Sequence, residues 1–185
     1  MMVNHHAIGL LLFATVTHDQ QMLASEGKLP RTGGHMDRQA LLKQVYMFRA
    51  VTADDLAALL AISETRSYAP GDTIYRNGEP AKELFVIEMG TVDIGLPDRK
   101  VPIMTVGSGQ VFGEITFFDR GERTAVASTR EVTYLMRMPY DHLDTLLNER
   151  PGLALHFYRG MCTHLTRLLR HLVHDVSVDT IRRLL

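Results

Sequence analysis

Apolar residues first recur at helical spacing near residue 40. They stand at Ala40, Leu41, Val45 and Phe48, a spacing typical of one face of an α-helix. A second helix is expected after Thr52, because Asp55 follows three residues later in a capping-box-like arrangement. The apolar positions of this second helix are Leu56, Leu59, Leu60 and Ile62.

After Ser63 the pattern changes from helical spacing to short segments rich in β-branched and aromatic residues, separated by Gly71, Gly78 and Gly90. Apolar residues alternate with polar ones in two of these segments. The alternating positions are Leu84, Val86, Val92, Ile94 and Leu96, and then Val132, Tyr134, Met136 and Met138. Many short strands with glycine turns and no helix between them predict a small antiparallel barrel or jelly roll.

Helical spacing returns at the C-terminal end of the chain. A first helix is marked by Tyr140, Leu143, Leu146 and Leu147. A longer helix is expected from Pro151, a residue suited to the first helical turn. Its apolar seam consists of Ala154, Tyr158, Met161, Leu165, Leu168 and Leu172, with a flanking line of Leu155, Cys162 and Leu169. Because this seam is long for packing on a barrel alone, we expect a homodimer joined through the helix; the alternative is a core helix.

The length of 185 residues fits one domain with an extension. We assign residues 1–36 to an N-terminal extension, expected to be flexible, 37–175 to the domain with its long helix, and 176–185 to a tail. The apolar run from Ala7 to Val16 is shorter than the roughly 18–20 residues that cross a bilayer. No Lys or Arg precedes this run, which argues against a signal peptide. We therefore expect no membrane partner.

Charge and cysteine content narrow the class of protein further. The chain has 20 basic and 21 acidic residues, a net charge of −1, whereas proteins that bind phosphate backbones usually carry a basic surplus. Nucleic acid is therefore not expected as a partner. The single cysteine, Cys162, excludes an intramolecular disulfide and favours a reducing, cytoplasmic compartment. Its place beside the helical seam indicates a buried, small apolar residue.

The segment from Gly107 to Ala125 carries the candidate chemistry. It offers a glycine approach, a short helical turn, and then an arginine followed by a hydroxyl. Free backbone N–H groups at such a turn can bind an anion, and Arg123 can add a charge-assisted contact to a phosphate. Glu114 is a hydrogen-bond acceptor suited to a sugar hydroxyl. The simpler interpretation is that Arg123 pairs with Asp119 or Glu122 on a solvated loop.

The order of residues in this segment resembles the cyclic nucleotide-binding domain family of catabolite activator protein, protein kinase A regulatory subunits and nucleotide-gated channels. The phosphate-binding cassette of the family is matched by Phe112-Gly113-Glu114-Ile115 and by Arg123-Thr124-Ala125. Turn glycines of the family are matched by Gly71, Gly78, Gly90 and Gly109, and the resemblance runs from about Asp37 to Val173. It implies an α+β fold: an antiparallel β-jelly-roll barrel with N-terminal helices and C-terminal B and C helices.

The resemblance also implies roles for single residues. Glu114 would accept the ribose 2′-hydroxyl, and Arg123 would bind the exocyclic phosphate oxygens. Gly113, Ile115 and Thr116 would bring backbone amides to the ligand, while Thr124 would place its hydroxyl beside phosphate or base, next to Ala125. Thr124 leaves cAMP and cGMP both open, with a slight preference for cAMP. Thr116 stands where the family usually has a smaller residue.

Residues that would cap the base are expected on the long helix. The register of the catabolite-activator branch places Leu168 and Leu169 at these positions, where polar residues are usual. The channel branch places His164 there, with Arg167 one turn beyond. We keep His164, Arg167 and Leu168 as possible base-capping residues. The apolar pair leaves open whether the ligand is capped at all.

The output of such a domain depends on the segment attached to its long helix. In the catabolite-activator branch this helix leads into a winged helix-turn-helix DNA-binding domain, whereas here it leads only into the tail from Asp175 to Leu185. We therefore expect a non-catalytic cyclic nucleotide sensor whose C-terminal helices move on ligand binding and whose output is an unidentified effector protein. The alternative is a dimerisation or protein-interaction module of the same fold that no longer responds to ligand.

Cupin-type metalloenzymes share the jelly roll and are a third hypothesis. Their metal site needs a His-x-His pair on barrel strands. None of the nine histidines forms such a pair, and five of them fall on predicted helices. We therefore expect no enzyme activity and no metal.

Overall fold

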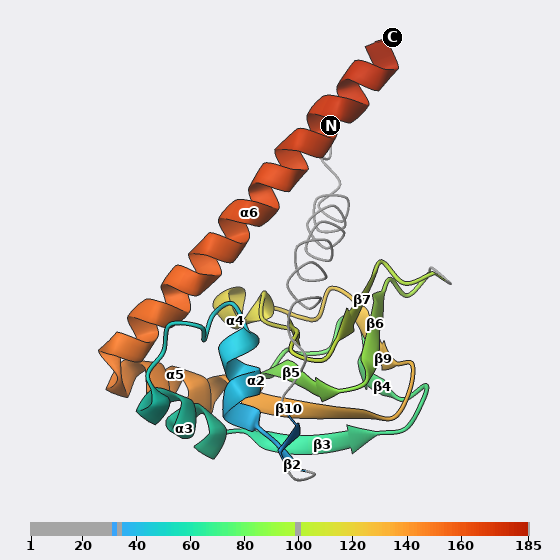
Figure 1. Ribbon diagram of the computed structural model, residues 1–185. Helices are drawn as coiled ribbons and strands as arrows, with labels where there is room; N and C mark the ends of the chain where they lie inside the picture. Colours follow the sequence, from blue (N-terminus) through green and yellow to red (C-terminus); the bar gives the residue numbers. More distant parts are fainter. Residues whose placement is uncertain (1–30, 33–34, 99–100, 185) are drawn as a thin grey trace.

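The computed structural model describes residues 31–32, 35–98 and 101–184 (Figure 1), with side chains described for residues 37–98, 101–166 and 170. The proposed N-terminal extension therefore lies mostly outside the described residues. Its last part forms a small hairpin, in which β1 (Arg31–Thr32) pairs antiparallel with β2 (His35–Met36).

Two capped helices precede the strands. Helix α2 (Arg38–Gln44) begins after Asp37, whose carboxylate accepts the amide hydrogens of Gln39 and Ala40 at 3.1 Å. Helix α3 (Ala53–Ala61) begins after Thr52. The Thr52 hydroxyl accepts from the Asp55 amide at 3.2 Å and donates to the Asp55 carboxylate at 2.8 Å. The expected capping arrangement is therefore confirmed, and side-chain caps of this kind satisfy backbone donors that a helix start leaves unpaired.

The strands form two four-stranded antiparallel sheets, which confirms the predicted fold class (Figure 1). The first sheet has the order β3 (Glu64–Tyr68), β10 (Thr133–Pro139), β5 (Glu83–Met89), β8 (Val111–Phe112). The second has the order β4 (Thr73–Tyr75), β9 (Val126–Thr129), β6 (Thr91–Gly95), β7 (Met104–Gly107). Sequence neighbours such as β5 and β6 lie in different sheets, as a jelly roll requires.

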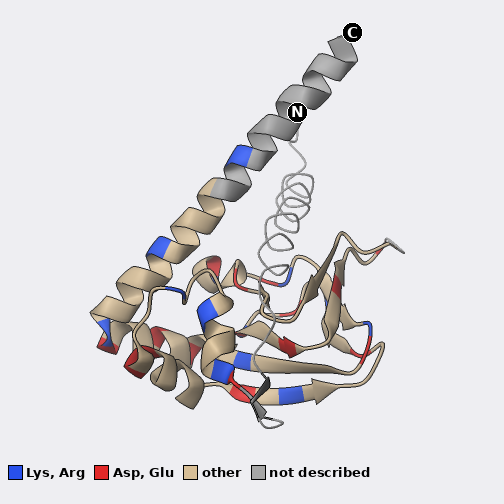
Figure 2. Ribbon diagram, viewed as in Figure 1, with Lys and Arg blue, Asp and Glu red and all other residues tan. Residues whose placement is uncertain are grey.

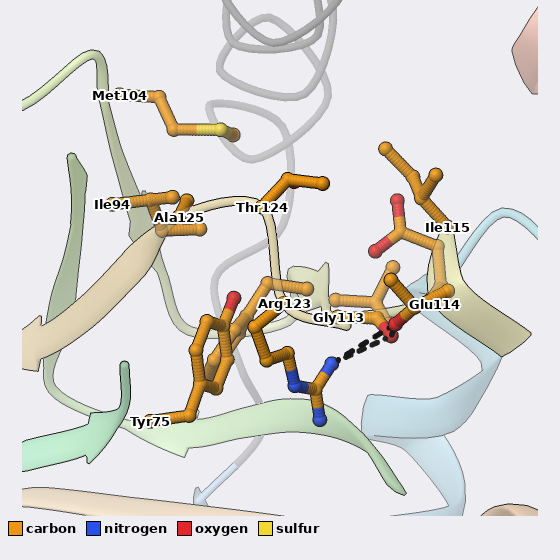
Figure 3. Close-up of a pocket in the computed structure, with 12 residues that line it drawn as sticks. Tyr75, Ile94, Met104, Gly113, Glu114, Ile115, Arg123, Thr124 and Ala125 are labelled. Atoms are coloured by element: carbon orange, nitrogen blue, oxygen red, sulfur yellow. Dashed lines mark hydrogen bonds between the residues drawn. The ribbon is translucent and has the colours of Figure 1, made fainter. Parts of the chain in front are cut away.

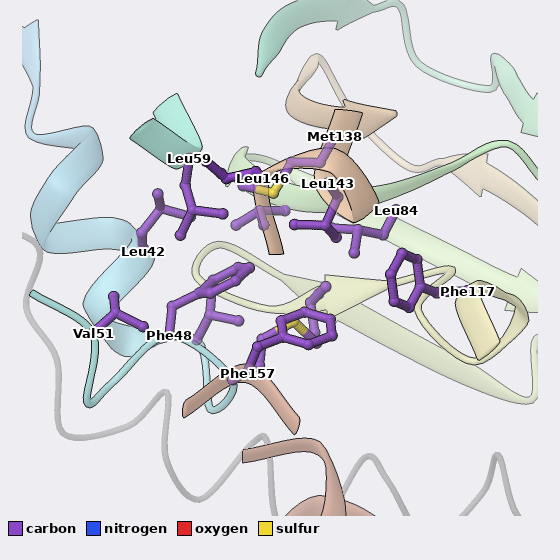
Figure 4. Packing of buried hydrophobic residues seen from close by; sticks show 14 of the residues in the cluster. Leu42, Phe48, Val51, Leu59, Leu84, Phe117, Met138, Leu143, Leu146 and Phe157 are labelled. Carbon is purple, nitrogen blue, oxygen red and sulfur yellow. The ribbon is translucent and has the colours of Figure 1, made fainter. Parts of the chain in front are cut away.

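Two hydrophobic clusters fill the domain, and β5 contributes to both. Leu84 and Val86 pack in the cluster that the helices cover, together with Leu42, Phe48, Leu59, Leu143 and Phe157 (Figure 4). Phe85 and Ile87, on the opposite face of the strand, pack between the sheets with Ile94 and Leu135. Five consecutive residues of β5, from Leu84 to Glu88, are buried. The four apolar ones are buried because each face of the strand meets a different core.

Of the four alternating positions predicted around β10, Met136 and Met138 are buried and the first two are not. Val132 and Tyr134 are exposed, whereas Leu135 is completely buried. The register with β5 shifts between Tyr134 and Leu135. The extra residue of this β-bulge is Glu88 in β5, because β10 pairs with β3 without a shift. Side chains of β10 therefore alternate regularly: Tyr134 is on the face of Met136 and Met138, which pack under the helices, whereas Leu135 faces the core between the sheets.

The C-terminal helices are α5 (Tyr140–Glu149) and α6 (Pro151–Leu184). Figure 1 shows the first turns of α6 beside α5, after which the helix runs away from the sheets. Its buried side chains are Leu153, Phe157 and Met161. The face that packs on the domain is therefore offset from the predicted seam, in which Tyr158 and Leu165 are exposed. Cys162 is also exposed, so its predicted burial is wrong.

Candidate functional site

The cassette turn joins β8 to the short helix α4 (Thr116–Asp119). Gly113 begins this turn with φ +77°, a conformation that side chains other than glycine rarely adopt. A Cβ atom there would also lie 2.7 Å from Arg123 Nη1. Glycine at this position therefore allows the arginine to lie directly against the turn.

Arg123 is buried beneath the cassette turn, only 4% exposed. Its Nη2 donates to the Glu83 carbonyl at 2.5 Å and its Nη1 to the Gly113 carbonyl at 3.1 Å. Its side chain forms no ion pair with any described residue, so the simpler interpretation, pairing with Asp119 or Glu122 on a solvated loop, is wrong. Carbonyl dipoles compensate the charge of Arg123, and the guanidinium remains able to bind an anion.

Aromatic rings hold the other side of this arginine. The Arg123 guanidinium carbon lies 4.3 Å from the centroid of the Tyr75 ring and 5.6 Å from that of Phe85. Cation–π contacts of this kind stabilise a guanidinium that has left water. Figure 3 shows the arginine beside the Tyr75 ring.

Glu114 is the other buried charged residue of the turn, with 5% of its surface exposed. Figure 3 shows its carboxylate pointing to the other side of the turn from the guanidinium. Burial raises the pKa of Glu114 to about 7 from its ordinary 4.5, and its own amide, the Tyr46 hydroxyl and the Arg123 charge oppose this rise. A carboxyl with such a pKa can gain or lose a hydrogen-bonding proton close to neutral pH.

The remaining predicted residues lie around the same turn. Neither Ile115 nor Thr116 donates its amide hydrogen to a backbone carbonyl of the described residues, so both can serve an anion. Thr124 is exposed at the rim, and Ala125 is buried behind it. All seven predicted binding residues line one cavity: Gly113, Glu114, Ile115, Thr116, Arg123, Thr124 and Ala125.

The cavity is mainly apolar and nearly filled in this structure. Its apolar wall includes Tyr75, Ile94 and Met104 (Figure 3). The free space within it is about 20 Å³, little more than a single water needs. Drug-sized ligands occupy several hundred Å³. The enclosed space is therefore smaller than such a ligand.

Of the three possible base-capping residues, only His164 lies among the described side chains; Arg167 and Leu168 lie outside them. The His164 ring stacks on Tyr46, with ring centroids 4.1 Å apart. The Tyr46 hydroxyl donates to Met161 Sδ at 3.8 Å. Sequence reasoning missed Tyr46, an aromatic residue two positions before Phe48 in the chain.

Other kinds of site are not evident in the described part of the chain. No group of three or more His, Cys, Asp or Glu side chains there could hold a metal ion. Among the described residues there is also no helix long and apolar enough to cross a membrane. Figure 2 shows acidic and basic positions interspersed over the described elements.

The residues of this site match a known protein family. Residues 65–150 match the family model of the cyclic nucleotide-binding domain. Residues 65–150 therefore belong to the cyclic nucleotide-binding domain family. The match includes the whole cassette from Phe112 to Ala125, so the resemblance read from the sequence is confirmed.

Relatives and solved structures agree with this assignment. The chain is 29% identical over 142 residues to a CRP-like cAMP-activated global transcriptional regulator of Mycobacterium tuberculosis, covering 75% of this chain and 63% of that protein. The N-terminal domain of a transcriptional regulator from Streptomyces coelicolor A3(2) superimposes with a TM-score of 0.64 and 29% identity, over 69% of this chain and 93% of that one. The Thermus thermophilus catabolite activator protein shares the fold, with a TM-score of 0.61 and 24% identity over 74% of this chain and 63% of its own.

Proposed function

We propose that this domain is a non-catalytic sensor that binds a cyclic nucleotide, cAMP or cGMP. The observation that supports this most directly is the placement of Arg123 and Glu114 on opposite sides of one glycine turn, both buried. One cation and one acceptor suit a ligand that carries a single negative charge next to a sugar hydroxyl. Arg123 would bind the phosphate and Glu114 the ribose 2′-hydroxyl.

The rest of the turn would complete the nucleotide site. The amides of Ile115 and Thr116 would donate to phosphate or ribose, and exposed Thr124 would meet phosphate or base. Gly113 and Ala125 leave room for the ligand. The apolar wall formed by Ile94 and Met104 suits the flat face of a purine. The regulator from Mycobacterium tuberculosis is described as cAMP-activated, which adds to the slight preference for cAMP.

Ligand entry would require the cassette to open, because the cavity holds about 20 Å³ of free space. The stack of Tyr46 on His164 offers a route from the cassette to α6, since the Tyr46 hydroxyl lies against Glu114. A nucleotide that takes up the Glu114 carboxylate would weaken this contact and shift the position of the C-terminal helices. Such a shift occurs only if the two arrangements differ in affinity for the nucleotide.

We further propose a homodimer joined through α6. Large apolar side chains are exposed on and beside this helix: Phe118 (48%), Leu155 (48%), Tyr158 (43%) and Leu165 (39%). Phe118 and Tyr158 lie together, with ring centroids 6.3 Å apart. A second copy that packs on this face would remove the apolar surface from water. The output would pass to an effector protein, within the cytoplasm and without nucleic acid as a partner of this domain.

Isothermal titration of the full chain with cAMP and with cGMP tests the sensor. Arg123→Ala is expected to weaken binding by about 10- to 150-fold, the loss of a charge-assisted hydrogen bond. Arg130→Ala is the matched control, because Arg130 pairs with Asp93 away from the cavity. Arg123→Lys keeps the charge in case the alanine variant does not fold. Absence of binding at millimolar concentration of both nucleotides would overturn the proposal.

The second candidate, an interaction module that no longer responds to ligand, remains because the enclosed space of the site is small. It predicts a dimer whose melting temperature is unchanged by either nucleotide. Sedimentation velocity tests the dimer itself: Leu155→Glu with Leu165→Glu should produce a monomer of 20.8 kDa, whereas Val132→Glu, at an exposed position just before β10, should not. A monomeric wild-type chain would contradict the homodimer.

A further inference from the structure

Two hydroxyl groups lie beside Arg123, the residue proposed to bind the phosphate. Thr116 Oγ1 and the Tyr140 hydroxyl oxygen are 2.8 Å apart. Arg123 Nη1 lies within hydrogen-bond distance of both, at 3.2 Å from Thr116 Oγ1 and 3.4 Å from the Tyr140 oxygen. All three groups also donate to a single acceptor, the Gly113 carbonyl oxygen. The turn, the arginine and the start of α5 therefore meet in one hydrogen-bonded cluster.

The position of the Tyr140 hydroxyl is fixed by the groups that surround its ring. Tyr140 is 2% exposed. Its ring meets Phe117 edge-on, with centroids 5.3 Å apart, and the Arg120 guanidinium lies 4.9 Å from its centroid. Arg120 in turn pairs with Asp144 of α5. Because the ring cannot turn without disturbing these contacts, its hydroxyl is held where Arg123 needs an acceptor.

The same residue is tied to the strand that holds the arginine from the other side. The Tyr140 amide donates to the Lys82 carbonyl at 2.8 Å, and the next carbonyl, that of Glu83, accepts from Arg123 Nη2. Among the described residues, Nε of Arg123 donates to no acceptor, and one Nη2 hydrogen also remains. A guanidinium is planar, so fixing Nη1 and one Nη2 hydrogen also fixes the direction of the remaining donors.

We propose that Thr116 and Tyr140 are positioning residues: their hydroxyls orient the Arg123 guanidinium so that its remaining donors meet the nucleotide phosphate. This inference rests on the proposed function. A side chain without a hydroxyl at position 116 could not complete the cluster. Because Tyr140 is the first residue of α5, any movement of Arg123 towards a phosphate is transmitted directly to that helix.

The test measures nucleotide affinity of the full chain by isothermal titration. Tyr140→Phe and Thr116→Val each remove one hydroxyl with little change of shape, and each is expected to weaken binding roughly tenfold. Thr116→Ser keeps the hydroxyl and should retain affinity within about twofold, which a purely steric role would not explain. Tyr134→Phe and Thr145→Val are the matched controls, because Tyr134 is 40% exposed and Thr145 donates only to Asp141 on the surface of α5.

A double-mutant cycle distinguishes positioning from a general loosening of the site. Arg123→Lys removes the planar guanidinium that the two hydroxyls would orient. In this background, adding Tyr140→Phe should therefore change nucleotide affinity by less than about twofold. If Tyr140→Phe lowers nucleotide affinity equally in the two backgrounds, the inference is overturned. It is also overturned if the wild type binds a nucleotide and Tyr140→Phe and Thr116→Val bind it as tightly. Failure of the wild type to bind any cyclic nucleotide would instead overturn the proposed function, and the inference with it.

Discussion

The Tyr46 ring lies nearly parallel to the His164 imidazole, with centroids 4.1 Å apart and an angle of 11° between the planes. Tyr46 belongs to the segment between α2 and α3, and His164 to α6. The stack therefore fastens the long helix to the N-terminal part of the domain, next to the buried Glu114 carboxyl that the same tyrosine contacts. Stability and ligand response are both expected to depend on it.

Removal of the imidazole tests the strength of this stack. His164→Ala should lower the free energy of unfolding by about 0.5–1.5 kcal/mol, the usual contribution of a ring pair beyond its burial. Urea denaturation checks this value. His142→Ala, on an exposed position of α5, is the control and should leave the free energy of unfolding nearly unchanged. Equal stability of the two variants would mean that the stack contributes nothing.

Close contact between α6 and the segment that joins α2 to α3 depends on Gly160. A Cβ atom there would lie 2.7 Å from the Met47 Cα and 2.9 Å from the Tyr46 carbonyl oxygen. These are backbone atoms, so the helix itself must move. Gly160→Ala should therefore destabilise the fold by about 1–3 kcal/mol, although alanine is the better helix former.

Gly152→Ala is a matched comparison in the same helix. No atom lies within 4 Å of a Cβ at Gly152, so this substitution should leave stability unchanged or raise it by up to about 1 kcal/mol. Thermal melts of both variants measure the difference. If Gly160→Ala melts at or above the wild-type temperature, α6 does not pack as closely as described.

The buried Glu114 carboxyl should make stability depend on pH. Its pKa is raised to about 7 in the folded protein from an ordinary 4.5, so between these values the folded state holds more protons than the unfolded state. Stability must then fall as pH rises from about 4.5 through 7, by up to about 3 kcal/mol.

Glu114→Gln has no titrating proton and should remove most of this decrease. Urea denaturation at pH 5 and pH 8 measures it for both proteins. Glu122→Gln, at an exposed carboxyl of the same loop, should behave like the wild type. A wild-type stability that is as independent of pH as that of Glu114→Gln would show that the carboxyl is not buried as described.

The two faces of β10 predict opposite results for two neighbouring residues. Leu135 is completely buried and Tyr134 is 40% exposed. Leu135→Ala should cost about 2–5 kcal/mol, whereas Tyr134→Ala should cost no more than about 1 kcal/mol. Chemical denaturation of both variants checks this order, which the plain alternation of apolar residues would reverse.

Much of the fold could be predicted from local pattern. The cap at Thr52, the helix start at Pro151 and the glycine-punctuated strands depend on neighbours within a few residues, so the sequence carries them. The bulge in β5 depends instead on pairing with β10. The buried face of α6 was predicted only in part for the same reason: Met161 of the predicted seam packs on the domain, but so do Leu153 and Phe157, and only the domain decides which apolar positions it covers.

The candidate site divides in the same way. The motif from Gly113 to Ala125 is short and specific, so the sequence alone identified residues that line the cavity. The acceptors of Arg123 were not predictable, because one is the carbonyl of Glu83, 40 residues away. Tyr140 appeared in the sequence only as an apolar position of a helix. The Tyr140 hydroxyl contacts Arg123 only because the fold brings the two residues together, so no local sequence pattern marks this contact.

Strand β5 joins the two cores, since Leu84 and Val86 face the helices while Phe85 and Ile87 face the opposite sheet. Its amide hydrogens can therefore exchange with deuterium only when both layers separate, which happens in global unfolding rather than in local fluctuations. The edge strand β4 is paired on one side only and should exchange much earlier. The slowest deuterium uptake in the molecule will thus mark the strand whose Glu83 carbonyl holds the arginine of the cassette.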